Sequence, residues 1–344
     1  MKILVTGGAG MIGSHTAEHF ARKGWKVTIL DNLIRSRLMG SEKKSVEYNW
    51  NYLARYKNIR RIRGDVRNER DVRKALGRGV DAIVHAAGQP GVGMSLREPA
   101  EDFSINALGT LCVLEGARRI CPKAAVVYCS TNKVYGENVE KFNLRERATR
   151  YEFSSGKAVS EAMPVDLTGH TPYGVSKYVG DLYVQEYAHA YGMKTAVFRM
   201  SCIYGTRQFG FEDQGWVAWF VIAAVRGLPL TVYGDGKQVR DVLFVTDLVT
   251  SYERFITGRL RHGVWNMGGG PGQTSSLLEL MARLEARFGR KLKVRYARWR
   301  TSDQKVYISD ISKVRRDLRW TPTVSVDRGV DRLLDWVRAN PGLF

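Results

Sequence analysis

The stretch from the start of the chain to Asp31 constrains the fold more than any other. An apolar segment at 2–6 runs into a glycine turn at 7–13, and a second apolar segment at 26–30 ends in Asp31. A helix is expected between the two segments, over 11–23. Strand, glycine turn, helix, strand and acid in this order are typical of the first unit of a dinucleotide-binding sheet. The chain is therefore predicted to begin with a βαβ unit.

The chemistry of this unit favours NAD. Glycines let the turn close tightly and let the backbone approach a pyrophosphate, to which the amino end of the helix presents free N–H groups. Asp31 follows at the distance expected of a carboxylate that binds both hydroxyls of the adenosine ribose. A carboxylate there would repel a 2′-phosphate, so NAD is favoured, although Arg35 and Arg37 leave NADP open.

The pattern of strands and helices then repeats. Further apolar segments occur at 58–63, 80–85 and 124–130, and a helix is expected over 103–120. Strands that alternate with helices through short connections predict an α/β protein of the Rossmann class, with a doubly wound parallel sheet. Ligands of such sheets bind at the carboxyl ends of the strands.

The composition limits size, location and metal content. With 344 residues and 44% hydrophobic content, the chain can build one large domain or two interlocked ones. It shows no signal peptide and no apolar run long enough for a membrane span. Its four cysteines form no C-x-x-C pair, so a cytoplasmic protein with reduced cysteines is predicted. No metal is expected, because His15 and His19 lack a third ligand.

The net charge of +20 is large. A field of this sign attracts nucleic acid, acidic membranes or phosphorylated small molecules. An ordinary arginine-rich surface facing water accounts for the same charge without any partner. Composition alone leaves these alternatives open.

Tyr173 and Lys177 form a pair that can transfer protons. Residues at this spacing lie on the same face of a helix, one turn from each other. A free tyrosine has a pKa of about 10, and a cationic lysine one turn away would stabilise the phenolate and lower that pKa. The pair alone also fits an ordinary surface helix. The proton-transfer interpretation is favoured in a chain that also has a nicotinamide cofactor and a further hydroxyl group, here that of Thr131.

Several segments occur in an order shared by a known group of enzymes: the glycine turn, Gly64-Asp65-Val66, Ala86-Ala87-Gly88, Asn106, residues 130–136, Tyr173 with Lys177, and Phe198-Arg199. Along nearly its whole length the chain resembles an extended short-chain dehydrogenase/reductase of the sugar-nucleotide epimerase and dehydratase group. Within this group it resembles the CDP-paratose (CDP-tyvelose) 2-epimerases more closely than other branches. The closer resemblance lies at 87–89, 130–136, 205–209, 213–217, 236–241 and 302–306.

The two residues after Thr131 separate the branches of the group. In the 4,6-dehydratases a threonine at this place is followed by Asp and Glu, the acid and base that expel water. Here Thr131 is followed by Asn132 and Lys133, so that elimination is disfavoured. The 4-epimerases carry small or hydroxyl residues at these two positions, and this sequence departs from them as well.

The resemblance implies an NAD-dependent epimerase that inverts C2 of the sugar in a nucleotide-diphosphate sugar through a transient 2-keto sugar. Tyr173 as phenolate would take the proton of the 2-hydroxyl, Thr131 would bond the reacting oxygen, and Lys177 would hold the nicotinamide ribose. Two alternatives stay open: a UDP-sugar 4-epimerase with the same catalytic residues, and a non-catalytic, RNA-binding member of the superfamily. The intact catalytic set favours an enzyme without a nucleic-acid or membrane partner.

The resemblance also assigns binding residues. Cofactor contacts are expected at Gly7, Gly10, Met11, Ile12, Gly13, Asp31, Asn32, Asp65, Val66, Ala86, Ala87, Gly88, Gln89, Asn106, Ser130, Tyr173, Lys177 and Met200. Substrate contacts are expected at Thr131, Asn132, Lys133, Gln208, Gln214, Arg240, Arg300 and Asp303. The two arginines lie where the family binds the nucleotide diphosphate. The two glutamines and Asp303 are candidates for contacts with the base or its ribose.

The resemblance further implies two interleaved domains. The NAD-binding Rossmann domain would comprise 1–204 with 241–262 returning to it, and a smaller nucleotide-sugar domain would comprise 205–240 and 263–344. A homodimer through the helices near 103–120 and 173–191 is expected. In the carboxyl half, the residues themselves predict a helix over 275–288 with Thr274 as its cap.

Overall fold

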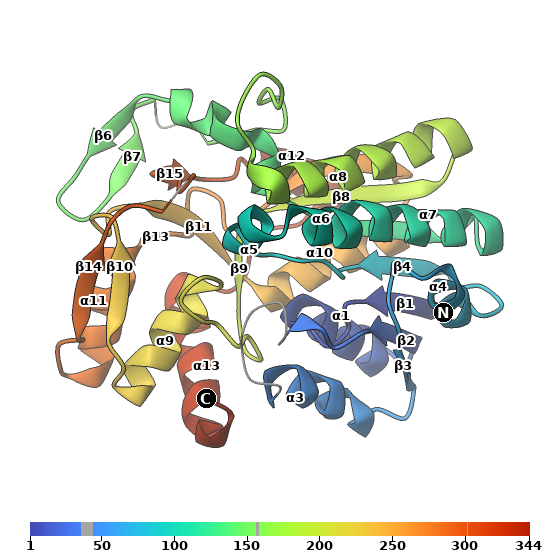
Figure 1. The fold of residues 1–344 in the computed structure, drawn as a ribbon, viewed down its shortest axis with the longest axis horizontal. Helices are drawn as coiled ribbons and strands as arrows, with labels where there is room; N and C mark the ends of the chain where they lie inside the picture. The colour runs from blue at the N-terminus through green and yellow to red at the C-terminus, as the bar shows by residue number, and fades with distance from the viewer. Residues whose placement is uncertain (36–43, 156–157, 301) are drawn as a thin grey trace. The chain divides into compact units, whose positions relative to one another are not determined.

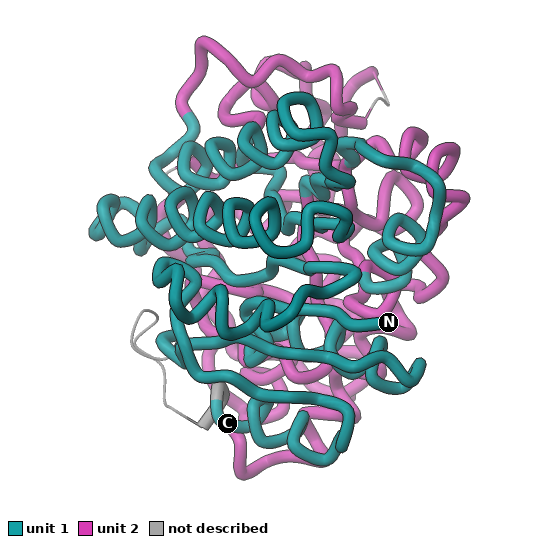
Figure 2. Tube along the Cα trace, turned by 90° about the vertical axis from the view of Figure 1, so that its right-hand side faces the viewer, with its two compact units in different colours: residues 1–134, 170–199, 249–265 teal, residues 135–169, 200–248, 266–344 magenta. Residues whose placement is uncertain are grey.

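The computed structural model describes residues 1–35, 44–155, 158–300 and 302–344 (Figure 1). Arg37 lies outside the described residues. Contacts divide the chain into two compact units, coloured separately in Figure 2. Unit 1 comprises 1–134, 170–199 and 249–265, and unit 2 comprises 135–169, 200–248 and 266–344. The segment 135–169 thus groups with unit 2, whereas the sequence-based division placed it in the NAD-binding domain.

Unit 1 is built on a seven-stranded sheet with the strand order β12-β8-β5-β4-β1-β2-β3. Figure 1 labels β4, β1, β2 and β3 of this sheet. The strands are β1 (Lys2–Thr6), β2 (Lys26–Asp31), β3 (Ile59–Arg63), β4 (Ala82–His85), β5 (Ala125–Thr131), β8 (Lys194–Met200) and β12 (His262–Met267). Strand β1 pairs in parallel with β2 and β4, and the outer pairs β2–β3 and β4–β5 are parallel as well. The predicted doubly wound α/β sheet is confirmed.

Helices connect these strands. They are α1 (Met11–Arg22), α3 (Lys44–Tyr52), α4 (Glu69–Leu76), α5 (Val92–Arg97), α6 (Pro99–Phe103), α7 (Gly109–Ile120) and α8 (Thr171–Tyr191), with a short 3-10 helix η1 (Leu53–Arg55). Strands β4 and β5 are buried along their whole length. Central strands of a parallel sheet are covered on both faces, which is why they read as continuous apolar runs.

The helix expected over 103–120 is a longer and less regular element. It begins with α6, continues through a π-helical turn, η2 (Ser104–Leu108), and ends as α7. The π turn contains Asn106, whose side chain is buried. Such turns often occur at functional sites, because they redirect a side chain that a regular helix would place elsewhere.

Unit 2 consists of small sheets and helices. Its strands are β6 (Leu144–Glu146), β7 (Tyr151–Phe153), β9 (Cys202–Tyr204), β10 (Leu230–Tyr233), β11 (Val239–Phe244), β13 (Thr274–Ser276), β14 (Val294–Ala297) and β15 (Val306–Tyr307). Its helices are α9 (Trp216–Arg226), α11 (Leu277–Phe288), α12 (Ser312–Leu318), α13 (Val326–Ala339) and η4 (Pro341–Leu343). The 3-10 helix η3 (Asn132–Lys141) begins in unit 1, and its residues 135–141 belong to unit 2. Helix α10 (Val245–Thr257) begins in unit 2 and ends in unit 1. Strand β11 is central, since β9, β13 and β15 all pair with it.

The predicted cap of the helix near residue 275 is wrong. Thr274 is the first residue of β13 and pairs with Asp241 of β11, so α11 starts only at Leu277. Ser276 is the cap: its side chain accepts from the N–H of Glu279, and the Glu279 side chain accepts from the N–H of Ser276. This reciprocal capping box satisfies two backbone donors that the start of a helix otherwise leaves unpaired.

The sequence predicts that the chain has no membrane-spanning segment and that its cysteines are reduced. Within the described ranges, no helix combines the length and the apolar character that a membrane crossing requires. All four cysteines are free thiols.

Candidate active site

The glycine turn after β1 is shaped for close approach of backbone to backbone. Gly7 adopts φ +70°, and a Cβ there would lie 2.6 Å from the Ala87 nitrogen. A Cβ at Gly13 would lie 2.1 Å from the Gly7 oxygen. Side chains at these two positions are therefore excluded, and the turn packs directly onto the end of β4. Met11 and Ile12 are the first residues of α1.

The amino end of α1 is free to meet an anion. Its capping residue, Gly10, provides no side-chain hydrogen bond, and the first turn carries no acidic residue. The first N–H groups of a helix have no partner within it, and the helix dipole adds positive charge there. This end of the helix can therefore hold a phosphate group.

Asp31 ends β2 beside this turn. One carboxylate oxygen accepts from the N–H of Ala9 at 2.9 Å, and the other accepts from the N–H of Leu33 at 2.8 Å. Burial raises the pKa of Asp31, while these two hydrogen bonds and the charge of Arg35 oppose that rise. With one backbone donor on each oxygen, the carboxylate keeps lone pairs that can accept from two hydroxyls.

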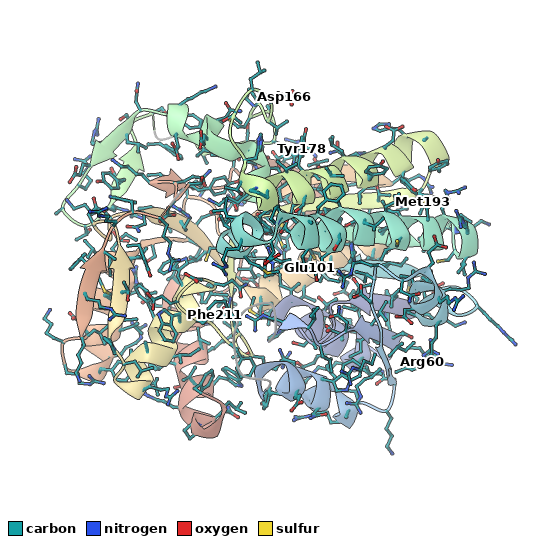
Figure 3. The ribbon with its side chains drawn as sticks, viewed as in Figure 1. Arg60, Glu101, Asp166, Tyr178, Met193 and Phe211 are labelled. Atoms are coloured by element: carbon teal, nitrogen blue, oxygen red, sulfur yellow. The ribbon has the colours of Figure 1, made fainter. Side chains whose placement is uncertain are left out.

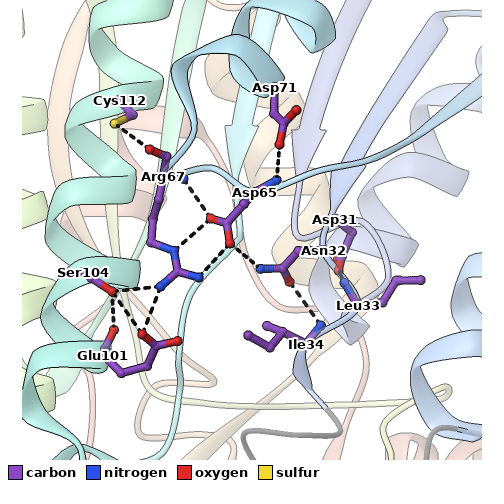
Figure 4. Close-up of polar contacts among 10 residues, drawn as sticks. All are labelled: Asp31, Asn32, Leu33, Ile34, Asp65, Arg67, Asp71, Glu101, Ser104 and Cys112. Carbon is purple, nitrogen blue, oxygen red and sulfur yellow. Dashed lines mark hydrogen bonds and ion pairs between the residues drawn. The ribbon is translucent and has the colours of Figure 1, made fainter.

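Asp65 follows β3 and lies next to the loop that contains Asn32. The Asn32 amide donates to Asp65 at 2.9 Å, and Arg67 donates to both Asp65 oxygens (Figure 4). Sequence reasoning did not single out Arg67, although it lies one residue beyond the Asp65-Val66 motif. Val66 itself is buried.

The end of β4 meets the π turn. Asn106 accepts from the N–H of Gln89 at 2.9 Å and donates to its carbonyl at 3.1 Å. The Gln89 side chain is buried and donates to Gly91 and to Asp102, so its amide is occupied within the protein. A Cβ on Gly88 would lie 2.9 Å from Asn106 and 3.7 Å from the Lys177 Nζ. Gly88 is thereby placed beside Lys177.

The three predicted catalytic residues converge in unit 1. Thr131 is the last residue of β5, and Tyr173 and Lys177 lie in the first turns of α8. The Thr131 hydroxyl lies close enough to Tyr173 to lower the pKa of its phenol. The ammonium group of Lys177 is buried and lies 4.2 Å from the centre of the Tyr128 ring.

The pKa values of the pair differ from the sequence-based expectation. Burial raises the pKa of Tyr173 to about 12, and the nearby Thr131 hydroxyl only partly opposes the rise. Burial also lowers the pKa of Lys177 to about 8. The predicted lowering of the tyrosine pKa is therefore not found in this structure, because removal of the phenolate from water outweighs the nearby favourable groups.

Two buried carboxylates support this site, and sequence reasoning missed both. Asp181 accepts from Ser130 at 2.8 Å and from the Arg199 Nε at 2.9 Å, which ties the end of β5 to α8 and β8. Asp102 accepts from Gln89 and from Asn106. An acid in the middle of a helix gives no local sign of burial, and only the Phe198-Arg199 motif pointed to part of this network.

The other candidates for substrate contact divide between the units. In unit 1, the Lys133 N–H donates to the Thr131 hydroxyl at 3.3 Å, and that hydroxyl donates to Asn132 at 3.4 Å. In unit 2, Gln208 accepts from the N–H of Gly205, and Gln214 pairs through its backbone with Phe211. Met200, which was predicted to contact the cofactor, ends β8 and is half-buried.

The two arginines of unit 2 that were predicted to bind the diphosphate, Arg240 and Arg300, each form an ion pair with an aspartate. Arg240 forms an ion pair with Asp303 at 2.6 Å. Arg300 forms one with Asp213 at 3.0 Å, and its guanidinium lies 3.9 Å from the centre of the Tyr233 ring. Both arginines are oriented by these partners. Among the described residues, no group of His, Cys, Asp and Glu is arranged to hold a metal ion.

The fold is that of a dinucleotide-binding enzyme, and Thr131, Tyr173 and Lys177 lie together in the unit that carries its parallel sheet. Residues 3–268 match the model of the NAD dependent epimerase/dehydratase family, and the chain belongs to that family. The expected family resemblance is thus confirmed, and the chain is a nucleotide-sugar epimerase or dehydratase that uses NAD.

Individual relatives span its full length. CDP-paratose 2-epimerase of Salmonella typhi is 37% identical, over 98% of this chain and 99% of that protein. The structure of UDP-glucose 4-epimerase with UDP-glucose from Thermotoga maritima has a TM-score of 0.83 and 28% identity, over 99% of this chain and 100% of that one. The structure of UDP-glucuronic acid 4-epimerase from Bacillus cereus, in complex with UDP-glucuronic acid and NAD, has a TM-score of 0.83 and 26% identity. The match covers 98% of this chain and 99% of that one.

Proposed function

We propose that this protein inverts C2 of the sugar in a nucleotide-diphosphate sugar of the CDP-paratose and CDP-tyvelose type. The observation that carries the proposal is the placement of the Thr131 hydroxyl beside Tyr173, in a chain where Asn132 and Lys133, and no carboxylate pair, follow Thr131. This arrangement supplies a proton acceptor but no acid and base for water elimination. The identity of 37% to CDP-paratose 2-epimerase of Salmonella typhi supports inversion at C2.

The described residues fit NAD. The glycine turn has no room for side chains, the amino end of α1 carries no acid, and Asp31 keeps free lone pairs. We assign the turn to the pyrophosphate, Asp31 to the adenosine ribose, and Lys177 to the nicotinamide ribose. When bound, NAD supplies a reversible hydride acceptor, which is restored in each cycle of an inversion.

Tyr173 is the proposed acceptor of the proton from the 2-hydroxyl. Its phenol must ionise before it can act, so the site needs groups that favour the phenolate. Thr131 provides one such group, because its hydroxyl beside the phenol lowers the pKa of Tyr173 against the effect of burial. Lys177 lies one turn further along α8 and is the nearest cationic candidate on that helix.

Arg240 and Arg300 are the proposed partners of the diphosphate. Guanidinium groups form paired hydrogen bonds with phosphate oxygens, and each of these two is already oriented by an acid. Gln208, Gln214 and Asp303 stay candidates for the base and its ribose. In this assignment Asp303 acts mainly by holding Arg240.

A UDP-sugar 4-epimerase is the second candidate, because it would use the same catalytic residues and the solved relatives from Thermotoga maritima and Bacillus cereus are 4-epimerases. Proton NMR of the protein with CDP-glucose, UDP-glucose and GDP-glucose in turn, without added cofactor, separates the two. A manno-configured product supports inversion at C2, and the fastest donor identifies the base. A galacto-configured product establishes the 4-epimerase. An RNA-binding protein without bound NAD would convert none of them.

We also expect a homodimer. Exposed apolar side chains gather on α6 to α8 of unit 1, namely Phe103, Leu108, Val175, Leu182 and Tyr183. An apolar group of this kind on neighbouring helices indicates a protein interface. Light scattering should give the mass of two chains, and Leu182→Asp should give the mass of one. A wild-type mass of one chain would contradict this expectation.

A further inference from the structure

Arg67 lies at the centre of a polar cluster that no step of the proposed reaction requires (Figure 4). Its Nε donates to one oxygen of Asp65 at 3.0 Å, and its Nη2 donates to the other at 2.7 Å. The backbone N–H of Arg67 donates to Asp65 as well, at 2.9 Å. The remaining arm of the guanidinium, Nη1, donates at 3.0 Å to both Glu101 and Ser104.

The cluster joins three segments of unit 1. Asp65 and Arg67 belong to the loop after β3, and Glu101 lies on α6 (Figure 3). Asp65 in turn accepts from Asn32, which lies in the loop after β2 next to Asp31. The side chain of Arg67 therefore connects α6 directly to the loop after β3. Through Asp65 and Asn32 it also reaches the loop after β2, at the edge where ligands of such sheets bind.

Each oxygen of the Asp65 carboxylate accepts two hydrogen bonds. A carboxylate has about four lone-pair positions. One Asp65 oxygen accepts from the Arg67 N–H and Nε, and the other accepts from the Arg67 Nη2 and from Asn32. Three of the four donors belong to Arg67, so the orientation of Asp65 depends mainly on this one residue.

The charge of Arg67 is as important as its shape. Asp65 and Glu101 bring two negative charges to an edge that is proposed to bind a negatively charged dinucleotide, and Asp31 lies close enough to interact with Asp65. The Arg67 guanidinium offsets one of these charges. Together with Asn32, it lowers the pKa of Asp65 to about 2 although burial acts in the opposite direction.

We infer that Arg67 is a positioning residue for the adenosine end of NAD: it fixes Asp65, and through Asp65 the loop of Asn32 and Asp31, before the cofactor binds. The inference rests on the proposed cofactor roles of Asp31 and Asp65. A site that is already ordered binds its ligand without the cost of ordering two loops. Arg67 is thus expected to govern cofactor affinity and to leave the chemistry at Tyr173 unchanged.

The test compares Arg67→Met with Arg118→Met in protein stripped of cofactor. Arg118 makes the same kind of two-bond pair, with Glu115 at 2.7 and 2.9 Å, but entirely within α7. Calorimetry with NAD and with AMP as probes should show about a tenfold or greater loss of affinity for both in Arg67→Met, and none in Arg118→Met. The value of kcat at saturating NAD should stay within about twofold of wild type.

Asp65→Asn completes a double-mutant cycle. If Arg67 acts through Asp65, Arg67→Met adds little to the loss that Asp65→Asn already causes. Unchanged NAD affinity in Arg67→Met, a loss that adds in full to that of Asp65→Asn, or a fall in kcat without a change in affinity would each overturn the inference. Unchanged affinity in Asp65→Asn would instead remove Asp65 from the cofactor site and so contradict the proposed site itself.

Arg67→Lys keeps the inference testable if Arg67→Met does not fold. Lysine retains the charge but lacks the planar fork that reaches both oxygens. Its NAD affinity should fall between those of wild type and Asp65→Asn. Wild-type affinity in Arg67→Lys would show that the two-oxygen contact has no role in cofactor binding.

Discussion

The hydroxyl of Thr131, the last residue of β5, lies beside the phenol of Tyr173 in the first turn of α8 and favours its phenolate form. The neighbouring Gly174 permits this approach, because a Cβ there would lie 2.9 Å from the carbonyl oxygen of Lys133. The geometry of the site thus depends on a glycine as well as on the reacting side chains.

Tyr173→Phe removes the phenolic oxygen and leaves the ring in place. Turnover should fall roughly 10²–10⁴-fold, the range typical of a lost general acid–base group. The NAD content of the purified protein should stay at the wild-type level, since the glycine turn, Asp31 and Lys177 are assigned to the cofactor and are unchanged. Turnover and cofactor absorbance, measured on the same preparation, check both statements. Wild-type turnover in this variant would exclude Tyr173 as the base.

The pH dependence of kcat/KM follows from the same residue. Burial raises the pKa of Tyr173 to about 12, and the phenolate is the form that accepts a proton. The reactive fraction therefore grows as pH rises, and kcat/KM should increase from about pH 6 to about pH 9. In Lys177→Met the loss of a positive charge should move this rise to higher pH. A flat profile in the wild type would contradict the assignment.

Arg199→Met breaks a buried ion pair. Arg199 and Asp181 are almost fully buried, and Asp181 would keep its hydrogen bonds from Ser130 and Gln185 but lose the cation of its ion pair. The free energy of unfolding should fall by about 3–5 kcal/mol. The matched control is Arg22→Met, which removes an exposed arginine from Glu18 and should cost less than about 1 kcal/mol. Urea unfolding of both variants measures the difference, and equal losses would refute this prediction.

His85 should make the protein sensitive to acid. Its ring lies between the hydroxyls of Thr6, at 2.7 Å, and Thr110, at 3.1 Å. Burial lowers its pKa from 6.5 to about 3, so the unfolded chain binds the extra proton first as the pH falls. Stability from this group is present above about pH 6.5 and is lost progressively toward pH 3.

His85→Gln provides the comparison, because glutamine cannot acquire this charge. The difference in unfolding free energy between wild type and His85→Gln should narrow on going from about pH 7 to about pH 4.5, by on the order of 1–3 kcal/mol. Denaturant unfolding at the two pH values measures the change. A difference that is independent of pH would show that His85 does not titrate in this range.

The sequence predicted those parts of the site whose residues are close together in the chain. The glycine turn, Asp31 and the Tyr173–Lys177 pair are recognisable because the chemistry fixes their spacing within one or two elements. The same holds for the central sheet, whose strands are short continuous apolar runs bounded by turn residues.

Other features depend on contacts between distant residues, which no local pattern reports. Arg67 gains its role only when α6 packs near the loop after β3, and Asp102 only when the π turn brings Asn106 to it. Ser276 replaces Thr274 as helix cap because Thr274 is drawn into a strand with Asp241. The raised pKa of Tyr173 likewise reflects burial, a property of the folded chain.

The most direct test of inversion at C2 uses CDP-paratose with deuterium at C2, incubated with the purified protein in ordinary water and followed by NMR and mass spectrometry. The proposal predicts CDP-tyvelose that still carries the deuterium at C2, because the hydride leaves and returns within one active site. A product inverted at C4, or a tyvelose product whose C2 label has been exchanged for solvent hydrogen, would contradict it.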